Sequence, residues 1–442
     1  MDDSKIKKYT LKNGIKVIIV PLKTKMTYIS LSMLLGSYHE KKGEGNLTHY
    51  YEHLLARLSS DKYKDYRYIG NEITKRGGIK NAYVNNYELF VYIKGFYKDF
   101  EFYIDIISNS IKKFYIDPKI ANNEKGAVIQ ELRNIISREN YDFDFLIFKY
   151  LYPKHFHLED FKKDIEYVKK YNIKLIRKFI RNKILTNNIV INAVCPLNKI
   201  KNTTKIINKY FGAIKKSKKK SLSYPVLSVN NNKFKLVQIK NKKDDENTII
   251  NIFTFMNIKH LSKEQLMQEL LQKILFNFDL GIFYKELREN LGIIYTINLY
   301  NNINIINSKQ SYFNIVTKCS LNNVPIVISK IFNILNNYKI TDDDISYAKR
   351  KMEADNEYGK FFAIESRSGY HNTFSLFNIP YKSPKEVLNE VRKIKNYEIR
   401  EYFEKFKKKI ISSAFLFYYS NKNIDKEIKS FIADKNNKII NK

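Results

Sequence analysis

Three residues near the start of the chain, His49, Glu52 and His53, have the types and the spacing that metal-dependent hydrolysis requires. Two histidines four residues apart lie one helical turn from each other, so both imidazoles can bind a single metal ion. Glu52 lies beside the pair, where a carboxylate can take a proton from metal-bound water and pass it to a leaving amine. The alternative is a helix with two surface histidines and a solvated acid.

A helix over residues 45–60 is predicted to position this set. At about 100° per residue, the three polar side chains share one side of the helix with Ala56. The other side is apolar and consists of Leu47, Tyr51, Leu54, Leu55 and Leu58. The apolar stripe can therefore face the core while the imidazoles point away from it.

A catalytic zinc site needs a third protein ligand, and a second helix offers two candidates. Asp117 as N-cap and Pro118 at the first helical position predict a helix that runs to about residue 138. Glu124 and Glu131 are seven residues apart on it, hence on one face near Val128. Considered alone, the two glutamates are more simply interpreted as solvated acids on an amphipathic helix. Beside the histidine pair they favour a His, His, Glu set, which leaves the fourth tetrahedral position open for water.

Composition bounds the class of protein. With 442 residues, 44% hydrophobic and 28% charged, the chain is long enough for two globular domains. No apolar run reaches membrane-spanning length, and residues 1–5 have neither a signal region nor a presequence, so the expected location is the cytoplasm. The only cysteines, Cys195 and Cys319, lie in separate strand-like runs and are expected to be buried free thiols.

The net charge of +34 raises nucleic acid as a partner. The lysines, however, are spread along the whole chain among many Asn, Ile and Tyr residues, a mixture typical of an AT-rich genome. We therefore expect no specific nucleic-acid partner, since net charge bears on solubility and non-specific contacts rather than on fold.

The order of predicted elements repeats once along the chain. Residues 1–214 read as a hairpin and strands, the histidine helix, two further strands, several helices, and a closing strand and helix. The basic, Ser-rich stretch 215–230 is predicted to be a linker. Residues 231–442 repeat the same outline. The fold class is therefore α+β, with two homologous domains, each a mostly antiparallel sheet covered by helices. The counterpart of the histidine helix, near residues 264–275, lacks a metal-binding set, so only the first domain should hold zinc.

Over nearly its whole length the chain resembles the inverted-zincin metallopeptidases, the family of pitrilysin, insulin-degrading enzyme and mitochondrial processing peptidase. Residues 36–40 resemble the Gly-Ser-x-x-Glu that leads into the zinc helix of that family, and residues 49–53 match its His-x-x-Glu-His. Glu124 and Glu131 match its pair of glutamates seven residues apart. The short two-domain length is that of bacterial-type members.

This resemblance implies a role for each residue of the set. His49, His53 and Glu131 would bind one Zn²⁺ per chain, Glu52 would be the general base, and Glu124 would support the ligands from outside. The other five histidines are expected to be non-ligands, mostly at the surface: His39, His155, His157, His260 and His371.

Two further stretches resemble substrate-binding segments of the family. Residues 78–83 are similar to its Gly-x-x-Asn-Ala edge strand, to which peptide substrates add themselves, so Asn81 and Ala82 are implied in substrate binding. In the second domain, residues 283–295 resemble its Leu-Arg-Glu-x-x-Gly-x-x-Tyr segment. The resemblance implies that Arg288 and Tyr295 hold the substrate backbone and the transition-state oxygen.

The predicted function is that of a zinc-dependent endopeptidase that cuts peptides or small unfolded proteins in a closed chamber. Short members of the family pair two chains, and this chain carries both the zinc set and the Arg–Tyr pair, so a homodimer is favoured. Two alternatives stay open. One is a dedicated maturation protease for a ribosomally made peptide, acting as a heterodimer with an inactive homologous subunit. The other is a non-catalytic scaffold homologue.

Overall fold

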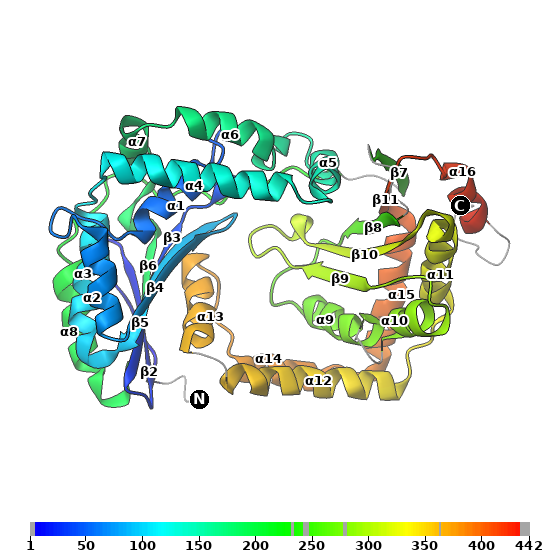
Figure 1. Ribbon diagram of the computed structural model, residues 1–442. Coiled ribbons are helices and arrows are strands. Elements are labelled where there is room, and N and C mark those ends of the chain that lie inside the picture. Colours follow the sequence, from blue (N-terminus) through cyan, green and yellow to red (C-terminus); the bar gives the residue numbers. More distant parts are fainter. Residues whose placement is uncertain (1–4, 231–233, 242–246, 277–280, 362–363, 434–442) are drawn as a thin grey trace. The chain divides into compact units, whose positions relative to one another are not determined.

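The computed structural model describes residues 5–230, 234–241, 247–276, 281–361 and 364–433 (Figure 1). These residues form two compact units. Unit 1 contains Met1–Tyr141, Phe156–Pro225 and Gly359–Tyr381, and unit 2 contains Asp142–His155, Val226–Tyr358 and Lys382–Lys442. The chain changes units after Pro225, inside the stretch 215–230. The units differ from a simple division into halves, because 142–155 and 359–381 are exchanged between them.

Unit 1 is built on a six-stranded sheet in the order β1-β2-β6-β3-β5-β4. The predicted first hairpin is confirmed, since β1 and β2 are antiparallel and Gly14 in their turn has φ +92°, a conformation that favours glycine. The β2–β6 pair is parallel, and the other pairs are antiparallel. The strands are β1 (Lys7–Thr10), β2 (Lys16–Leu22), β3 (Met26–Leu34), β4 (Ile79–Val84), β5 (Glu88–Phe96) and β6 (Ile189–Pro196).

Helices of unit 1 pack on this sheet through apolar stripes. The predicted stripe of the histidine helix is confirmed, because its five members are 0–4% exposed. Residues 160–183 form two helices and not one, since the Asn172 side chain accepts a hydrogen bond from Leu175 N at 3.0 Å and starts a new helix. The helices are α1 (Leu47–Ala56), α2 (Tyr66–Lys75), α3 (Phe100–Lys112), α4 (Pro118–Ile136), α6 (Phe161–Lys170), α7 (Ile173–Lys183) and α8 (Ile200–Phe211).

Unit 2 repeats this topology on a five-stranded sheet, in the order β7-β11-β8-β10-β9. The β7–β11 pair is parallel, as β2–β6 is in unit 1, and the remaining pairs are antiparallel. The duplicated α+β architecture predicted from the sequence is therefore confirmed. The strands are β7 (Lys235–Lys240), β8 (Asn247–Phe255), β9 (Ile297–Asn302), β10 (Tyr312–Ser320) and β11 (Phe415–Ser420).

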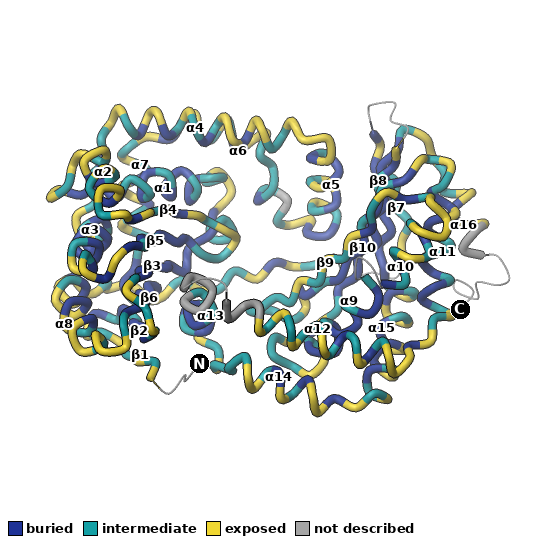
Figure 2. Tube along the Cα trace, turned by 60° about the horizontal axis from the view of Figure 1, so that its bottom comes forward, coloured by how far each residue is buried: buried dark blue, intermediate teal, exposed yellow. Residues whose placement is uncertain are grey.

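The helices of unit 2 follow the same order as those of unit 1. Residues 385–407 likewise lie in two helices, because Ile394 and Lys395 between them are extended. The helices are α9 (Lys263–Phe276), α10 (Ile282–Tyr284), α11 (Val324–Asn337), α12 (Asp342–Phe361), α14 (Pro384–Lys393), α15 (Asn396–Ser413) and α16 (Asp425–Ala433). Figure 2 shows buried residues along the strands of both sheets and exposed ones along the outer sides of helices such as α4 and α14.

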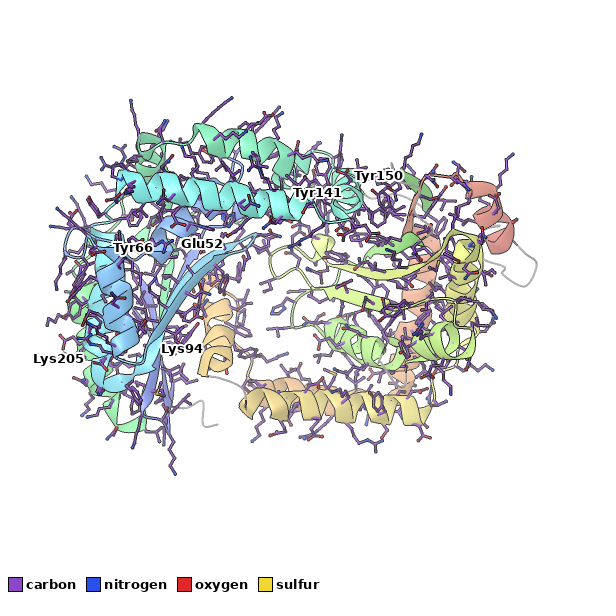
Figure 3. The ribbon with its side chains drawn as sticks, viewed as in Figure 1. Glu52, Tyr66, Lys94, Tyr141, Tyr150 and Lys205 are labelled. Carbon is purple, nitrogen blue, oxygen red and sulfur yellow. The ribbon has the colours of Figure 1, made fainter. Side chains whose placement is uncertain are left out.

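Two helices were not expected from the sequence, α5 (Tyr141–Leu151) and α13 (Ile364–Leu376). Within unit 2, the Tyr150 ring of α5 meets the rings of Phe415 and Phe417 on β11, each with centroids 5.6 Å apart (Figure 3). Within unit 1, α13 packs on β6, β3 and β2, and Leu376 joins their apolar cluster. Each half of the chain thus supplies one helix to the sheet formed by the other half.

Two expectations from composition can be compared with the structure. Cys195 and Cys319 are both free and buried, which confirms them as buried thiols. Within the described ranges, no helix combines the length and the apolar character needed to cross a membrane.

Candidate metal centre

Helix α1 holds the His-x-x-Glu-His set on the side turned away from its apolar stripe. The side chains of His49 and His53 are 21% and 15% exposed, whereas Glu52 is buried. Helix α4 packs against α1, and Figure 3 shows Glu52 on α1 next to it. Asp117 caps α4 as predicted, since its carboxylate accepts from the backbone of Lys119 and Ile120.

Glu131 of α4 completes a set of three ligand atoms. Its Oε2 lies 3.2 Å from His49 Nε2, its Oε1 lies 3.6 Å from His53 Nε2, and the two Nε2 atoms are 3.2 Å apart. Tetrahedral zinc with bonds of about 2.0–2.2 Å has ligand atoms roughly 3.3–3.6 Å apart. The three residues therefore match the size of a zinc site. Among the described residues, they form the one group of at least three His, Cys, Asp or Glu side chains whose ligand atoms all lie within 4.8 Å of one another.

The outer nitrogens of both imidazoles are already engaged. His53 Nδ1 lies 3.1 Å from a carboxylate oxygen of Glu124, which can only accept, so Nδ1 carries the proton. His49 Nδ1 lies 3.0 Å from Asn46 Oδ1 and donates to it in the same way. Both Nε2 atoms then present lone pairs to each other and to Glu131. Three electron-rich atoms at this distance repel one another unless a cation lies between them, which is the chemistry of a metal site.

Glu124 takes the supporting position and not that of a ligand. Its side chain is 8% exposed, and it accepts from His53 and from the Arg57 guanidinium, whose Nε lies 2.8 Å from Oε1. Burial raises the pKa of Glu124, but these hydrogen bonds outweigh burial and the net pKa is lowered. Glu124 therefore stays ionised and holds the His53 ring in place.

The pKa values of His49 and Glu52 suit metal binding and base chemistry. Burial, with the charge of His53, lowers the pKa of His49 to about 4, so His49 is neutral and can act as a ligand. Burial lowers the pKa of His53 too, but Glu124 and the nearby carboxylates outweigh it and the net shift is upward. Burial raises the pKa of Glu52 to about 7, with smaller contributions from Glu131 and Glu124. A pKa near neutrality is suited to a general base.

Strand β4 lies at one edge of the unit 1 sheet, beside α1. Its side chains alternate: Asn81 and Tyr83 are exposed, and Ala82 is buried at 8%. Lys80 of this strand donates to the carbonyl of Ala56, the last residue of α1, at 2.6 Å. The edge predicted to receive a peptide is therefore tied directly to the end of the histidine helix.

Arg288 and Tyr295 lie together in unit 2. The guanidinium carbon of Arg288 lies 5.1 Å from the ring centroid of Tyr295, and its Nη1 donates to Ile294 O at 3.1 Å. Tyr295 is 75% exposed. The structure thus brings these two side chains next to each other, whereas the five residues of the zinc set meet within unit 1.

Sequence reasoning missed several residues of the centre. Asn46 and Arg57 lie three residues before His49 and four after His53, so helical spacing alone could have indicated them. Asp164, which binds Asn46, is more than a hundred residues distant, and no local signal indicated it. Among the histidines taken for non-ligands and expected mostly at the surface, His371 is buried, with 3% exposure.

Comparisons with known proteins agree with this architecture. The insulinase family, peptidase family M16, matches residues 16–165, and the peptidase M16 inactive domain matches residues 171–352. An uncharacterized zinc protease of Rickettsia bellii (strain RML369-C) is 19% identical over 397 residues, which cover 88% of this chain and 92% of the relative.

Solved structures share the fold at low identity. A protease from Helicobacter pylori has a TM-score of 0.77 at 16% identity, covering 94% of this chain and 99% of its own. A peptidase M16 inactive domain from Pseudomonas fluorescens has a TM-score of 0.78 at 14% identity, covering 95% and 98%. In both comparisons nearly the whole length of each protein is matched, so this chain shares their two-domain fold.

Proposed function

The chain belongs to the insulinase family, peptidase family M16, and on that premise we propose that it is a zinc-dependent endopeptidase acting on peptides or small unfolded proteins. One observation carries the proposal. The Nε2 atoms of His49 and His53 and the carboxylate of Glu131 lie 3.2–3.6 Å from one another, and the outer nitrogen of each ring is already held by another side chain.

His49, His53 and Glu131 would hold the zinc ion. When bound there, zinc lowers the pKa of a water molecule and polarises the scissile carbonyl. Glu52 takes a proton from the attacking water and returns it to the leaving amine. Its buried position beside two other carboxylates keeps its proton affinity high enough for this exchange. Glu124 fixes the orientation of the His53 ring through Nδ1.

Substrate would bind as an added strand along β4, past Asn81 and Ala82, because its outer edge ends the sheet of unit 1. The guanidinium of Arg288 and the exposed hydroxyl of Tyr295 would donate hydrogen bonds to the oxyanion that develops on the substrate. Their adjacency in unit 2 supports a joint role, since Arg288 packs over the Tyr295 ring.

The assembly is part of the proposal. Because one chain carries both the zinc set and the Arg–Tyr pair, we favour a homodimer that encloses its substrates over a heterodimer with an inactive subunit. Gel filtration of the purified chain, with a cleavage assay on each fraction, decides between them. Activity that requires a second, homologous protein would support the dedicated maturation protease instead. The cytoplasmic location expected from the sequence stays a prediction.

Two variants test the chemistry. We expect Glu52→Gln to keep zinc and lose cleavage, because the amide cannot accept the proton, whereas His49→Ala should lose both. Zinc content by metal analysis and cleavage of a mixed peptide library by mass spectrometry are the measurements. Undiminished hydrolysis by Glu52→Gln would remove Glu52 from its role. A pure wild-type chain unable to hold zinc would refute the hydrolytic proposal.

A further inference from the structure

The backbone immediately before the histidine helix has an unusual conformation. Asn46, the N-cap of α1, lies in the left-handed region with φ 59° and ψ 20°. Asparagine is among the few residues other than glycine that tolerate this region. An N-cap asparagine ordinarily accepts a hydrogen bond from the first turn of its own helix, but the Asn46 side chain makes no such bond. Its amide is therefore available for other partners.

A carboxylate from outside the helix caps α1 in its place. Glu40, buried at 9% exposure, accepts from the backbone N–H of Thr48 at 2.6 Å and from that of Asn46 at 2.9 Å. These are the donors that an N-cap side chain or solvent would otherwise satisfy. The helix end is thus stable without any contribution from the Asn46 amide.

The Asn46 amide instead connects a buried acid to a predicted zinc ligand. Its Nδ2 donates to Asp164 Oδ2 at 2.7 Å, and Asp164 is only 2% exposed. This contact fixes which end of the amide faces each way, so Oδ1 faces His49 and accepts from Nδ1 at 3.0 Å. Gly45 makes room for it, because a Cβ on Gly45 would lie 1.8 Å from an oxygen of Asp164.

We infer that Asn46 and Asp164 are positioning residues that hold His49 with its proton on Nδ1 and its Nε2 lone pair directed at the metal. This inference rests on the proposed zinc function and extends it. Glu124 performs the corresponding task for His53 with a charge. Asn46 performs it with a neutral amide whose orientation Asp164 determines. Removal of such outer partners typically weakens metal binding by about tenfold to a hundredfold.

The test separates the side chain from the backbone. Asn46→Gly keeps the left-handed conformation available but removes Oδ1, so the zinc affinity should fall by about tenfold to a hundredfold. Asn257→Gly is the matched control, because Asn257 has φ 53° and lies in unit 2. It makes the same exchange in the unit that does not contain the proposed zinc ligands, and the zinc affinity should not change. Affinity is measured on the full chain by competition with a chromophoric chelator.

A reciprocal exchange tests the connection itself. Asn46→Asp alone places two carboxylates against each other and should weaken zinc binding. Combined with Asp164→Asn, it restores one acceptor toward His49 and one donor between positions 46 and 164, and should recover affinity close to the wild-type value. Failure of the double variant to recover, in a chain that unfolds at the wild-type temperature, would overturn the connection.

Nitrogen NMR of ¹⁵N-histidine-labelled, metal-free protein gives a readout that does not depend on zinc or on activity. The wild type should show His49 with the proton on Nδ1, and Asn46→Gly should shift part of the population to the Nε2–H form. An unchanged tautomer and unchanged zinc affinity in Asn46→Gly would overturn the inference. A wild-type chain that shows the Nδ1–H form but binds no zinc would instead refute the proposed function and leave the positioning role intact.

Discussion

The two units place different residues at equivalent points of the same topology. His49 and His53 are the third and seventh residues of α1, and Gln265 and Glu269 are the third and seventh residues of α9. Helix α1 follows β3, the third strand from the β4 edge of its sheet. Helix α9 follows β8, the third strand from the β9 edge of its sheet. Unit 2 therefore retains the position of the metal centre without its ligands.

The same correspondence extends to the long helices α4 and α12. Glu131 and Asp355 are the fourteenth residues of these helices, so an acid occurs at both positions. In unit 2, Lys273 donates to Asp355 at 2.6 Å. Gln265 donates to Glu269 at 2.8 Å. Unit 2 thus satisfies its acids with its own donors.

In unit 1 the cationic donor does not bond the acid of the candidate metal centre. Arg57, the counterpart of Lys273 by position, bonds Glu124 and leaves Glu131 to face the two imidazoles. The candidate metal centre therefore differs from its counterpart in two ways: it has two imidazoles, and Arg57 pairs with Glu124 and not with Glu131. A site that neutralises its own acids has no need of an external cation, which is a physical reason to expect no zinc in unit 2.

The largest effect is expected when the unit 2 residues are placed in unit 1. The triple variant His49→Gln, His53→Glu, Glu131→Asp should bind no zinc and show no cleavage, because it replaces both imidazoles and shortens the acid. Zinc content and peptide cleavage are the measurements, with circular dichroism to show that the chain is folded. Retention of zinc by this variant would mean that the comparison does not identify the ligands.

A second prediction concerns one acid of each unit in the metal-free protein, the buried Glu52 and the partly buried Glu269. The pKa of Glu52 is raised from 4.5 to about 7 in the folded chain, so folding favours the protonated carboxyl. Its contribution to the free energy of unfolding is fully present below pH 4.5 and is lost as the pH rises through 7. Glu52→Gln should therefore stabilise the metal-free chain by about 3 kcal/mol at pH 8 and by at most about 1 kcal/mol at pH 5. Thermal unfolding in a chelator at both pH values measures this difference.

Glu269→Gln in unit 2 provides the comparison for that experiment. Burial raises the pKa of Glu269 as well, so the sign of the pH dependence should be the same. An opposite sign in either variant would show that the acid is stabilised in its charged form, which would contradict the burial argument at that centre.

Much of this comparison could be predicted from local sequence, and part of it could not. The ligand pair, the apolar face of α1 and the cap of α4 follow from helical periodicity, because all their partners lie within a turn or two. The two-domain repeat was likewise visible in the order of strands and helices. These features depend on residues that are neighbours along the chain.

The elements that escaped prediction depend on distant partners. Helices α5 and α13 carry aromatic and apolar residues that find their contacts on the sheet of the other half, so neither half alone explains them. The division of 160–183 into α6 and α7 depends on one asparagine side chain at Asn172. The role of Asp164 depends on a contact with Asn46 that sequence spacing does not reveal.

The smallest effect is expected when the cationic side chains of Arg57 and Lys273 are removed, each in its own variant. Arg57→Met removes one hydrogen-bond partner of Glu124. The guanidinium then no longer opposes the effect of burial on the pKa of Glu124, so this pKa rises and the hydrogen bond that Glu124 accepts from His53 weakens. Arg57 is one contact further from the metal than Glu124, so we expect zinc affinity to fall by about threefold to tenfold, at or below the range for direct outer partners. Chelator competition on the full chain measures it.

Lys273→Met is the matched change in unit 2. It breaks the ion pair with Asp355, whose side chain is 42% exposed, so the loss of stability should be at most about 1 kcal/mol. Zinc affinity should equal that of the wild type, because the metal is held in unit 1. If both methionine variants weakened zinc binding equally, the cations would act through overall charge. An effect confined to Arg57→Met would show that the direction in which the cation points distinguishes the metal centre from its counterpart.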